Sequence, residues 1–441
     1  MKIDSITIKN FKKINNISLD LSGQFNLIVG ENGTGKTSVL EALCVAMGAF
    51  LSGIDGIPSV NFTKDEIRRE TLLYGEASLE YQYKLPVEIT CDMLIDGEHF
   101  EVTRHKRKLN SSRTTVEPRN ITNIARNMLE DLNKVLPVLC YQGISRLSDQ
   151  KRKKWGGSVR TAESRRNGYM DCMDASSSMK MINSWFKRMD HISLQKHKVV
   201  AEYAAVTNAA ENFMKHMLDY AKEIHIYYDA TEGEIVYERG KQVLPLRLLS
   251  SGFRTLVGMV MDIAYRMAVL NPFLGEKITQ ETDGMVLIDE LDMHLHPTWQ
   301  WRVISALKNT FPKVQFVATT HSPLIISSVE DNDKVVSMSD LCGGLPEYLL
   351  PSKGWLVGDV LTERMGTMDR SPQIIEKLAR LKVLGKKRMT GVFSDKELAE
   401  YNGLISELKD MLPENDTVIE EVALFNLREM VAFENDKSKK V

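Results

Sequence analysis

The sequence lacks paired cysteines and an excess of charge of either sign. Its five cysteines include no C-x-x-C pair and lie far apart, at Cys44, Cys91, Cys140, Cys172 and Cys342. This odd, scattered set argues against a disulfide framework and is typical of reduced thiols in a cytosolic protein. Lysine and arginine number 57 against 59 aspartate and glutamate, for a net charge of −2. A basic surface over the whole protein is therefore excluded, and any contact with nucleic acid requires a local patch.

Long hydrophobic runs and sustained repeats are also missing. The N-terminus alternates polar and apolar residues and has no signal-peptide core. The most apolar long stretch, 256–270, is interrupted by Asp262 and Arg266, which predicts a core helix and not a membrane span. No heptad repeat is sustained over residues 150–222. We therefore expect a cytoplasmic protein of ordinary globular composition, 43% hydrophobic and 26% charged, without membrane contact.

A phosphate-binding loop is the most specific motif in the sequence. The short apolar run 25–29 predicts a buried strand, and residues 36–47 have the apolar spacing of a helix. Between them lies G-x-x-x-x-G-K-[ST], which ends in Lys36 and Thr37. Its glycines let backbone N–H groups face a phosphate, the lysine contacts the β- and γ-phosphates, and the hydroxyl binds Mg²⁺. The alternative is a chance glycine-rich turn, which the flanking strand and helix disfavour.

An acidic pair follows a second apolar strand. The segment GMVLIDE ends in Asp289 and Glu290. In a doubly wound sheet, the carboxyl end of such a strand faces the ligand crevice. Asp289 would hold Mg²⁺ there, and Glu290 would polarise the attacking water. The alternative is an ordinary strand end before a helix cap, and the phosphate loop upstream favours the functional interpretation.

Two further segments have both a structural and a functional interpretation. Ser250, Ser251 and Gly252 precede a long helical pattern, where they form either an anion site or simply an N-cap. His321 follows a strand predicted over 314–318. Its ring is able to donate a hydrogen bond to a γ-phosphate, and the alternative is a structural histidine with satisfied hydrogen bonds.

Together and in order, these motifs resemble the ABC-type ATPase heads of the RecF, Rad50 and SMC class, over roughly residues 1–325. The resemblance implies an α/β fold. Its expected parts are a mixed or parallel P-loop sheet, an antiparallel β subdomain, a helical insertion and a helical C-terminal region. In this class 249–252 looks like the signature motif and His321 like the switch histidine. Gln142 occupies the place of the glutamine that senses Mg²⁺ and the attacking water.

The resemblance also implies the ligands and the site residues. ATP and Mg²⁺ would bind, and ATP would be hydrolysed to ADP and phosphate. The implied catalytic residues are Glu290, His321 and Gln142, and the implied metal ligands are Thr37, Asp289 and Gln142. The implied ATP-binding residues are Gly30, Glu31, Asn32, Gly33, Thr34, Gly35, Lys36, Thr37, Ser38, Ser250, Ser251 and Gly252.

We expect four segments along the chain. They are an N-terminal lobe of the head (1–148), a helical insertion (149–222), a C-terminal lobe (223–345) and a helical C-terminal region that is a candidate for partner docking (346–441). In this class, ATP on Lys36 of one head is closed by Ser250 and Gly252 of a second head. The resemblance therefore implies a homodimer or higher oligomer held by ATP-sandwiched heads.

Three stretches narrow the resemblance. Residues 136–147, 167–174 and 284–297 are similar to the stand-alone ATPase component of Septu antiphage systems, some of which are attached to retrons. That similarity implies a separately encoded HNH-type nuclease, with the ATPase as sensor, scaffold or restraint. No nuclease is evident in this chain, because the acidic turn 331–333 lacks a flanking strand and glycine. Two alternatives stay open: a RecF-like DNA repair ATPase that clamps DNA, and a scaffold that binds ATP without hydrolysing it.

Two local basic runs are candidates for contact with the phosphate backbone of DNA or RNA, including retron nucleic acid. The first comprises Arg104, Lys106, Arg107, Lys108, Arg113 and Arg119, and the second Lys151, Arg152, Lys153, Lys154, Arg160, Arg165 and Arg166. Solvated loop surface is the alternative for both. His294 and His296 suggest a metal pair only weakly, since side chains two apart on a helix do not share a face.

Overall fold

The computed structural model divides into two compact units, residues 1–365 and 366–441. It describes residues 1–74, 78–111, 114–144, 164–174, 179–218, 224–338, 346–389 and 394–420. Most of the second predicted basic run, from Lys151 to Arg160, lies outside these residues, as does Arg113.

The strands are β1 (Lys2–Phe11), β2 (Ile14–Asp20), β3 (Phe25–Gly30), β4 (Arg69–Tyr74), β5 (Ser78–Tyr83), β6 (Val87–Ile95), β7 (Glu98–Lys106), β8 (Thr115–Glu117), β9 (Val138–Gln142), β10 (Ile224–Asp229), β11 (Glu234–Arg239), β12 (Gln242–Pro245), β13 (Gly284–Ile288), β14 (Val314–Thr319), β15 (Lys334–Met338) and β16 (Glu347–Leu349). The α-helices are α1 (Lys36–Leu51), α2 (Asn120–Glu130), α3 (Met179–Lys196), α4 (Ala201–Met217), α5 (Ser251–Leu270), α6 (Ile278–Glu281), α7 (Pro297–Gln300), α8 (Val303–Thr310), α9 (Pro323–Ile326), α10 (Val357–Glu363), α11 (Pro372–Met389) and α12 (Asp395–Met411). Short 3₁₀ helices lie at Arg165–Tyr169 (η2), Leu246–Leu248 (η3) and Pro272–Lys277 (η4).

A six-stranded sheet forms the centre of the first unit, in the order β16-β15-β3-β14-β13-β9. Strands β15, β3, β14, β13 and β9 are parallel, and β16 pairs antiparallel with β15 at one edge. The apolar runs predicted as strands are β3, β13 and β14, whose residues are almost all buried, as strands covered on both faces require. Because these strands are parallel, their carboxyl ends meet at one edge of the sheet.

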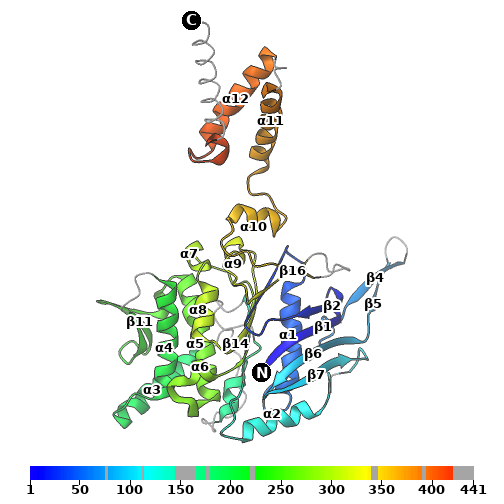
Figure 1. Ribbon diagram of the computed structural model, residues 1–441. Coiled ribbons are helices and arrows are strands. Elements are labelled where there is room, and N and C mark those ends of the chain that lie inside the picture. The colour runs from blue at the N-terminus through cyan, green and yellow to red at the C-terminus, as the bar shows by residue number, and fades with distance from the viewer. Residues whose placement is uncertain are drawn as a thin grey trace. The chain divides into compact units, whose positions relative to one another are not determined.

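An antiparallel sheet with the order β2-β1-β6-β7-β8 forms a second layer. Asp96 and Gly97, a residue pair typical of tight hairpin turns, join β6 to β7, and both have positive φ, 52° and 85°. Helix α1 contacts strands of both sheets (Figure 1) and is buried from Val39 to Leu51. One apolar core therefore runs from the antiparallel sheet through α1 into the parallel sheet.

Helices α3, α4 and α5 and the antiparallel strands β10-β11-β12 complete the first unit. Strands β10 and β11 form a hairpin that turns at Gly233. Helix α5 is buried on almost every side, which agrees with the core helix predicted from its apolar run. No helix among the described residues is long and apolar enough to cross a membrane.

The second unit contains α11 and α12, which pack through a small apolar cluster of Leu381, Leu384, Tyr401 and Leu408. Ion pairs cross between the two helices. Arg380 makes two hydrogen bonds with Glu400, of 2.6 and 2.7 Å, and Lys387 binds Glu397 at 2.6 Å. The segment 346–365, which contains β16 and α10, belongs to the first unit.

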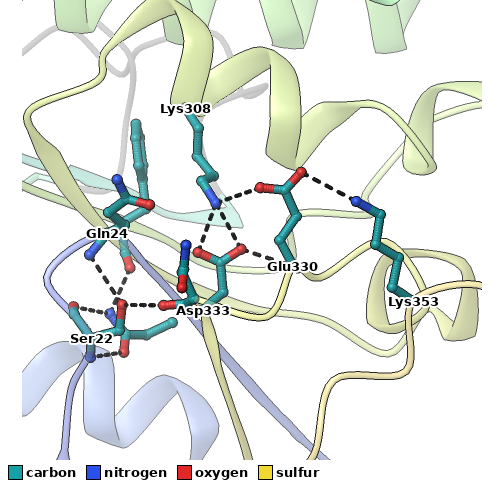
Figure 2. A network of polar contacts seen from close by, with 9 residues as sticks. Ser22, Gln24, Lys308, Glu330, Asp333 and Lys353 are labelled. Atoms are coloured by element: carbon teal, nitrogen blue, oxygen red, sulfur yellow. Dashed lines mark hydrogen bonds and ion pairs between the residues drawn. The ribbon is translucent and has the colours of Figure 1, made fainter.

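An ion-pair network that extends from the buried Asp333 to the surface lies at the amino ends of the parallel strands (Figure 2). The Lys308 ammonium donates to Glu330 at 2.9 Å and to both oxygens of Asp333 at 2.9 and 3.0 Å. The Asp333 side chain is fully buried, and Lys353 reaches Glu330 from the solvent side at 3.6 Å. The acidic turn 331–333 is thus followed by a strand, β15, contrary to the expectation that no strand flanks it, and Asp333 is neutralised by lysine.

We expect the substitution Lys308→Met to lower the free energy of unfolding by about 3 kcal/mol, because it leaves the Asp333 carboxylate buried without a cation. Lys353→Met is the matched control: its side chain is 63% exposed, and such surface pairs contribute about 1 kcal/mol or less. Urea unfolding of the two variants tests this. Equal losses for both would contradict the assignment of Lys308 as the essential cation.

Candidate functional site

The phosphate loop joins β3 to α1 through backbone that only glycine adopts easily. Gly30, Gly33 and Gly35 have φ values of 146°, 82° and 93°. A Cβ at Gly30 would lie 2.5 Å from the carbonyl oxygen of Met338 in the neighbouring strand. The loop therefore passes too close to β15 for a side chain, and α1 begins directly after it with its free N–H groups at the loop.

The Lys36 side chain folds back over this loop. Its ammonium donates to the carbonyl oxygens of Gly30 at 2.9 Å and Glu31 at 2.7 Å, and the residue is 7% exposed. Burial lowers the pKa of Lys36 below its ordinary value, and the negative charges of Asp289, Glu290 and Asp292 offset part of this. The cation is thus held beside the loop by neutral carbonyls, which an anionic phosphate could replace.

Thr37 and Asp289 meet at the carboxyl edge of the parallel sheet. The Thr37 hydroxyl lies 3.2 and 3.1 Å from the two carboxylate oxygens of Asp289, which is 1% exposed. Thr319, at the end of β14, donates to the same carboxylate at 2.6 Å. Hydroxyl and carboxylate oxygens are the donors that Mg²⁺ prefers, so this pair fits the ion chemically.

Glu290 has a positive φ of 49°, which turns the chain sharply after β13. Its backbone N–H donates to the Thr319 hydroxyl at 2.8 Å, and the next N–H, of Leu291, donates to the Thr319 carbonyl at 2.9 Å. Left-handed backbone at a residue other than glycine costs about 1–3 kcal/mol and clusters at functional sites. The two bonds from β14 hold this strained turn in place.

His321 follows β14 as predicted and is tied to the segment after Glu290. Its backbone N–H lies 3.3 Å from a carboxylate oxygen of Asp292, which also accepts the Thr320 hydroxyl. The next residue, Ser322, caps α9 and donates to Gln300 at 2.6 Å. The structure therefore joins the predicted acidic and histidine segments through the hydrogen bonds that Thr320 and His321 donate to Asp292.

Gln142 ends β9, directly beside β13. Its carbonyl oxygen accepts the backbone N–H of Asp289 at 2.9 Å, so the two residues are neighbours in the sheet. Its side chain is buried, and its amide nitrogen donates to Asp262 of α5 at 2.7 Å. From the sequence, Asp262 was apparent only as an interruption of an apolar run.

Ser250, Ser251 and Gly252 stand at the start of α5. Ser250 is in the N-cap position but makes no side-chain capping bond, and both serines are exposed. A Cβ at Gly252 would lie 2.3 Å from the carbonyl oxygen of His294. Within the described part of the chain, no hydrogen bond joins these three residues to the phosphate loop.

The first basic run is wrong as a surface for two of its residues. The side chains of Arg104 and Lys106 lie on the same, inner face of β7 as Val102. The two residues are 1% and 6% exposed. Arg104 donates to the Val45 carbonyl of α1 at 2.9 Å. In the second run Arg165 is also buried, and it donates to the Leu270 carbonyl at 2.6 Å. These cations satisfy buried carbonyls and do not face a nucleic acid.

The histidine pair is not a metal site in the described residues. His296 caps α7 by accepting the N–H of Thr298 at 3.3 Å. Among those residues, the one cluster of three or more histidine, cysteine, aspartate or glutamate side chains close enough to share a metal ion is Asp4, Asp92 and His99, on the outer face of the antiparallel sheet.

The mixed sheet, with a phosphate loop between β3 and α1 and an antiparallel sheet packed on α1, defines an ABC-type ATPase head. The chain belongs to the AAA domain family whose profile matches residues 5–225, half of its length. A second AAA domain family, whose description also names the AbiEii toxin and a Type IV TA system, matches residues 155–327. These matches support an ATPase.

Two relatives align over most of the chain. "Retron Vc95 probable ATPase" of Vibrio cholerae serotype O1 biovar El Tor is 25% identical over 77% of this chain and 74% of its own. "Septu protein PtuA" of Bacillus thuringiensis is 24% identical over 85% and 87%. A solved SMC head bound to the C-winged helix domain of ScpA covers 79% of this chain and 98% of its own, with 17% identity and a TM-score of 0.48. The resemblance to Septu and retron-associated ATPases is thus confirmed.

Proposed function

We propose that this chain is a dimeric ATPase that binds and hydrolyses ATP and regulates a separately encoded HNH-type nuclease in bacterial antiphage defence. The observation that carries the ATPase assignment is the convergence of Lys36, Thr37 and Asp289 at one edge of the parallel sheet. The names of the relatives, Septu PtuA and a retron ATPase, support the defence setting.

The phosphate loop would bind the triphosphate. Backbone N–H groups from Gly33 to Ser38 would surround the β-phosphate, and the Lys36 ammonium would leave two neutral carbonyls for phosphate oxygens. An ammonium–phosphate bond is charge-assisted and stronger than a bond to a neutral carbonyl. The exchange therefore favours the ATP-bound state.

Thr37, Asp289 and Gln142 would hold Mg²⁺, as the oxygen-rich donor set at the strand ends suits this ion. When bound, Mg²⁺ supplies neutralisation of the charge that develops on the phosphates. Thr319 fixes the Asp289 carboxylate through a 2.6 Å hydrogen bond to one of its oxygens.

Glu290 and His321 would act on the terminal phosphate. The strained turn at Glu290 is held to β14, and the Glu290 carboxylate would accept a proton from the attacking water. His321 would donate a hydrogen bond to a γ-phosphate oxygen, in a position maintained by Asp292. Neither group suffices alone, because the charge on the transferring phosphoryl group needs donors on several sides.

The missing donors would come from a second copy. Ser250 and Ser251 are exposed at the start of a 20-residue helix, whose N-terminus attracts anions. Gly252 rests against the His294 carbonyl, which ties this helix start to the segment after Glu290. In a symmetric dimer, the start of α5 in each copy would close the phosphate loop of the other copy, so the dimer would contain two equivalent ATP sites.

Mixing two inactive variants tests this arrangement. Lys36→Ala removes the phosphate cation, and Ser250→Arg blocks the helix start, so each alone should hydrolyse little ATP. An equal mixture contains dimers with one intact composite site, and we expect about a quarter of wild-type turnover if pairing is random. Lys36→Ala mixed with the double variant, which forms no intact site, is the control. Wild-type turnover by Ser250→Arg alone would contradict a shared site.

Identification of what co-purifies with the chain tests the nuclease partner. Suppose that an HNH nuclease binds the wild-type chain. If the DNA cleavage by this nuclease changes when the Lys36→Ala variant takes the place of the wild-type chain, the result supports regulation by the nucleotide. A chain that binds ATP and the nuclease but shows no turnover above that of Glu290→Gln would instead favour the scaffold that binds ATP without hydrolysing it.

A further inference from the structure

Strands β4 and β5 form an isolated ribbon. They pair with each other in antiparallel register and join no larger sheet. Figure 1 shows the ribbon reaching outward beyond the antiparallel sheet β2-β1-β6-β7-β8. A two-stranded ribbon is at best marginally stable by itself, because its faces bury little apolar surface. The core of the first unit therefore does not explain why the ribbon projects from it.

The two faces of the ribbon differ in their side chains. Directly opposed residues of an antiparallel pair point to the same face. The first face, here named the tyrosine face, consists of Arg69, Thr71, Tyr81 and Tyr83. The opposite face consists of Glu70, Leu72, Glu80 and Gln82. Over 69–72 and 80–83, where the ribbon's side chains are described, both carboxylates thus lie on the opposite face.

A cation lies over each ring of the tyrosine face. The Arg69 guanidinium is 4.6 Å from the centre of the Tyr81 ring, and the Lys64 ammonium is 5.2 Å from the centre of the Tyr83 ring. Tyr83 is half-buried and packs against the core, so it anchors the ribbon. Tyr81 is 48% exposed and Arg69 is also exposed. These two residues form a stack of two flat groups at the surface.

The cations on the two sides of the ribbon have different partners. Glu70 on the opposite face pairs with Arg68 at 3.0 Å and with Lys84 at 2.8 Å. Among the described residues, Arg69 and Lys64 form no ion pair with a carboxylate, and their contacts are the two tyrosine rings. The tyrosine face is therefore positively charged and complementary to an anion.

Flat groups and cations together indicate the kind of anion. An acidic peptide would pair with the cations but has no flat groups to cover the Tyr81–Arg69 stack. A nucleic acid has both parts, since its bases stack on aromatic rings and guanidinium planes and its phosphates pair with lysine and arginine. In a duplex the base faces are covered by neighbouring bases, so stacking on a side chain requires an unpaired strand.

We infer that the tyrosine face binds single-stranded nucleic acid, with a base on the Tyr81–Arg69 stack and phosphates beside Arg69 and Lys64. Stacking and phosphate contacts read neither the base sequence nor the 2′-hydroxyl, so DNA and RNA should bind alike. The inference does not depend on the proposed ATPase activity, because no residue of this face belongs to the phosphate loop.

Fluorescence anisotropy of a labelled oligo(dT) of about 16 nucleotides, with the full chain and without ATP, tests this. Tyr81→Ala removes the ring and should weaken binding by about fivefold or more, the smaller effect expected when one base loses its stacking partner. Tyr81→Phe keeps the ring and should bind like wild type. Arg69→Gln removes one phosphate contact, so the slope of log affinity against log salt should become shallower by about 0.7.

Gln82→Ala is the matched control. Gln82 is exposed and lies between the two tyrosines in the chain, but its side chain is on the opposite face. It should bind oligo(dT) like wild type. Oligo(U) of the same length should bind with an affinity similar to that for oligo(dT), and a blunt duplex of that length should bind more weakly to the wild-type chain.

Each contrary result overturns the inference. Wild-type chain that binds neither oligonucleotide at low salt, or that binds the duplex as tightly as oligo(dT), would do so. So would unchanged binding by folded Tyr81→Ala, or an equal loss in Tyr81→Phe or Gln82→Ala. Thermal unfolding shows whether the variants fold. If Tyr81→Ala does not fold, the salt dependence of Arg69→Gln decides, and a slope equal to that of wild type would overturn the inference.

Discussion

Replacing Glu290 by glutamine is expected to reduce ATP hydrolysis by at least about 100-fold, the usual contribution of a positioned general base. The amide has the shape of the carboxylate but cannot accept a proton from water. The backbone bond from Glu290 to Thr319 involves no side-chain atom of Glu290, so the turn after β13 should survive. ATP binding should therefore persist, and dimers closed by uncleaved ATP should accumulate. Single-turnover hydrolysis and light scattering measure the two effects.

Glu281→Gln is the control for this experiment. Glu281 is the last residue of α6, the helix that precedes β13. Its carboxylate is 45% exposed, and among the described residues it forms an ion pair only with Lys313. It should hydrolyse ATP at the wild-type rate and form no trapped dimer. A Glu290→Gln chain that remains monomeric in saturating ATP would refute the ATP-sandwiched dimer, and one with wild-type turnover would refute Glu290 as the base.

Replacing Lys36 by alanine is expected to weaken ATP binding by about 100-fold, since a hydrogen bond between charged groups contributes up to about 3 kcal/mol. The folded state should change little, because Lys36 contacts only two loop carbonyls that water can solvate once the side chain is gone. Calorimetric titration with ATP measures the affinity, and thermal unfolding confirms that the chain folds.

Lys9→Ala is the matched control for Lys36→Ala. Lys9 is 48% exposed and binds Glu88 across two strands of the antiparallel sheet, away from the phosphate loop. It should bind ATP with wild-type affinity. If the affinity of Lys36→Ala for ATP is within about threefold of wild type, the difference in binding free energy is less than about 1 kcal/mol. Such a result would contradict the assignment of the loop as the phosphate site.

The parts of the fold that were predictable have local patterns. The strand–loop–helix around Lys36, the β6–β7 hairpin and the buried strands β13 and β14 all follow from apolar runs and turn residues. Strand β15 was missed because its five residues, KVVSM, carry little pattern and take their place only by pairing with β3. Arg104 was misjudged for a related reason: its partner, the Val45 carbonyl, lies far away in sequence.

The same distinction applies to the candidate site. Lys36, Thr37 and Asp289 were found from motifs. Thr319, which binds the Asp289 carboxylate, and Asp262, which binds the Gln142 amide, were not found, because each contact joins elements that are distant in sequence. A usable pattern did exist for Asp262. A charged residue within an apolar helix, with an opposite charge at i+4, predicts a buried pair, since residues four apart share a helix face.

The position of Lys36 has a consequence for the cost of binding a nucleotide. Its ammonium is bonded to the Gly30 and Glu31 carbonyls, and positive φ values at Gly30, Gly33 and Gly35 set the course of the loop. Under the proposed function, phosphate oxygens would replace two carbonyl partners of one side chain, and the backbone around them is already part of the connection between β3 and α1. A site with such a preformed backbone avoids much of the entropic penalty that weakens binding to flexible segments.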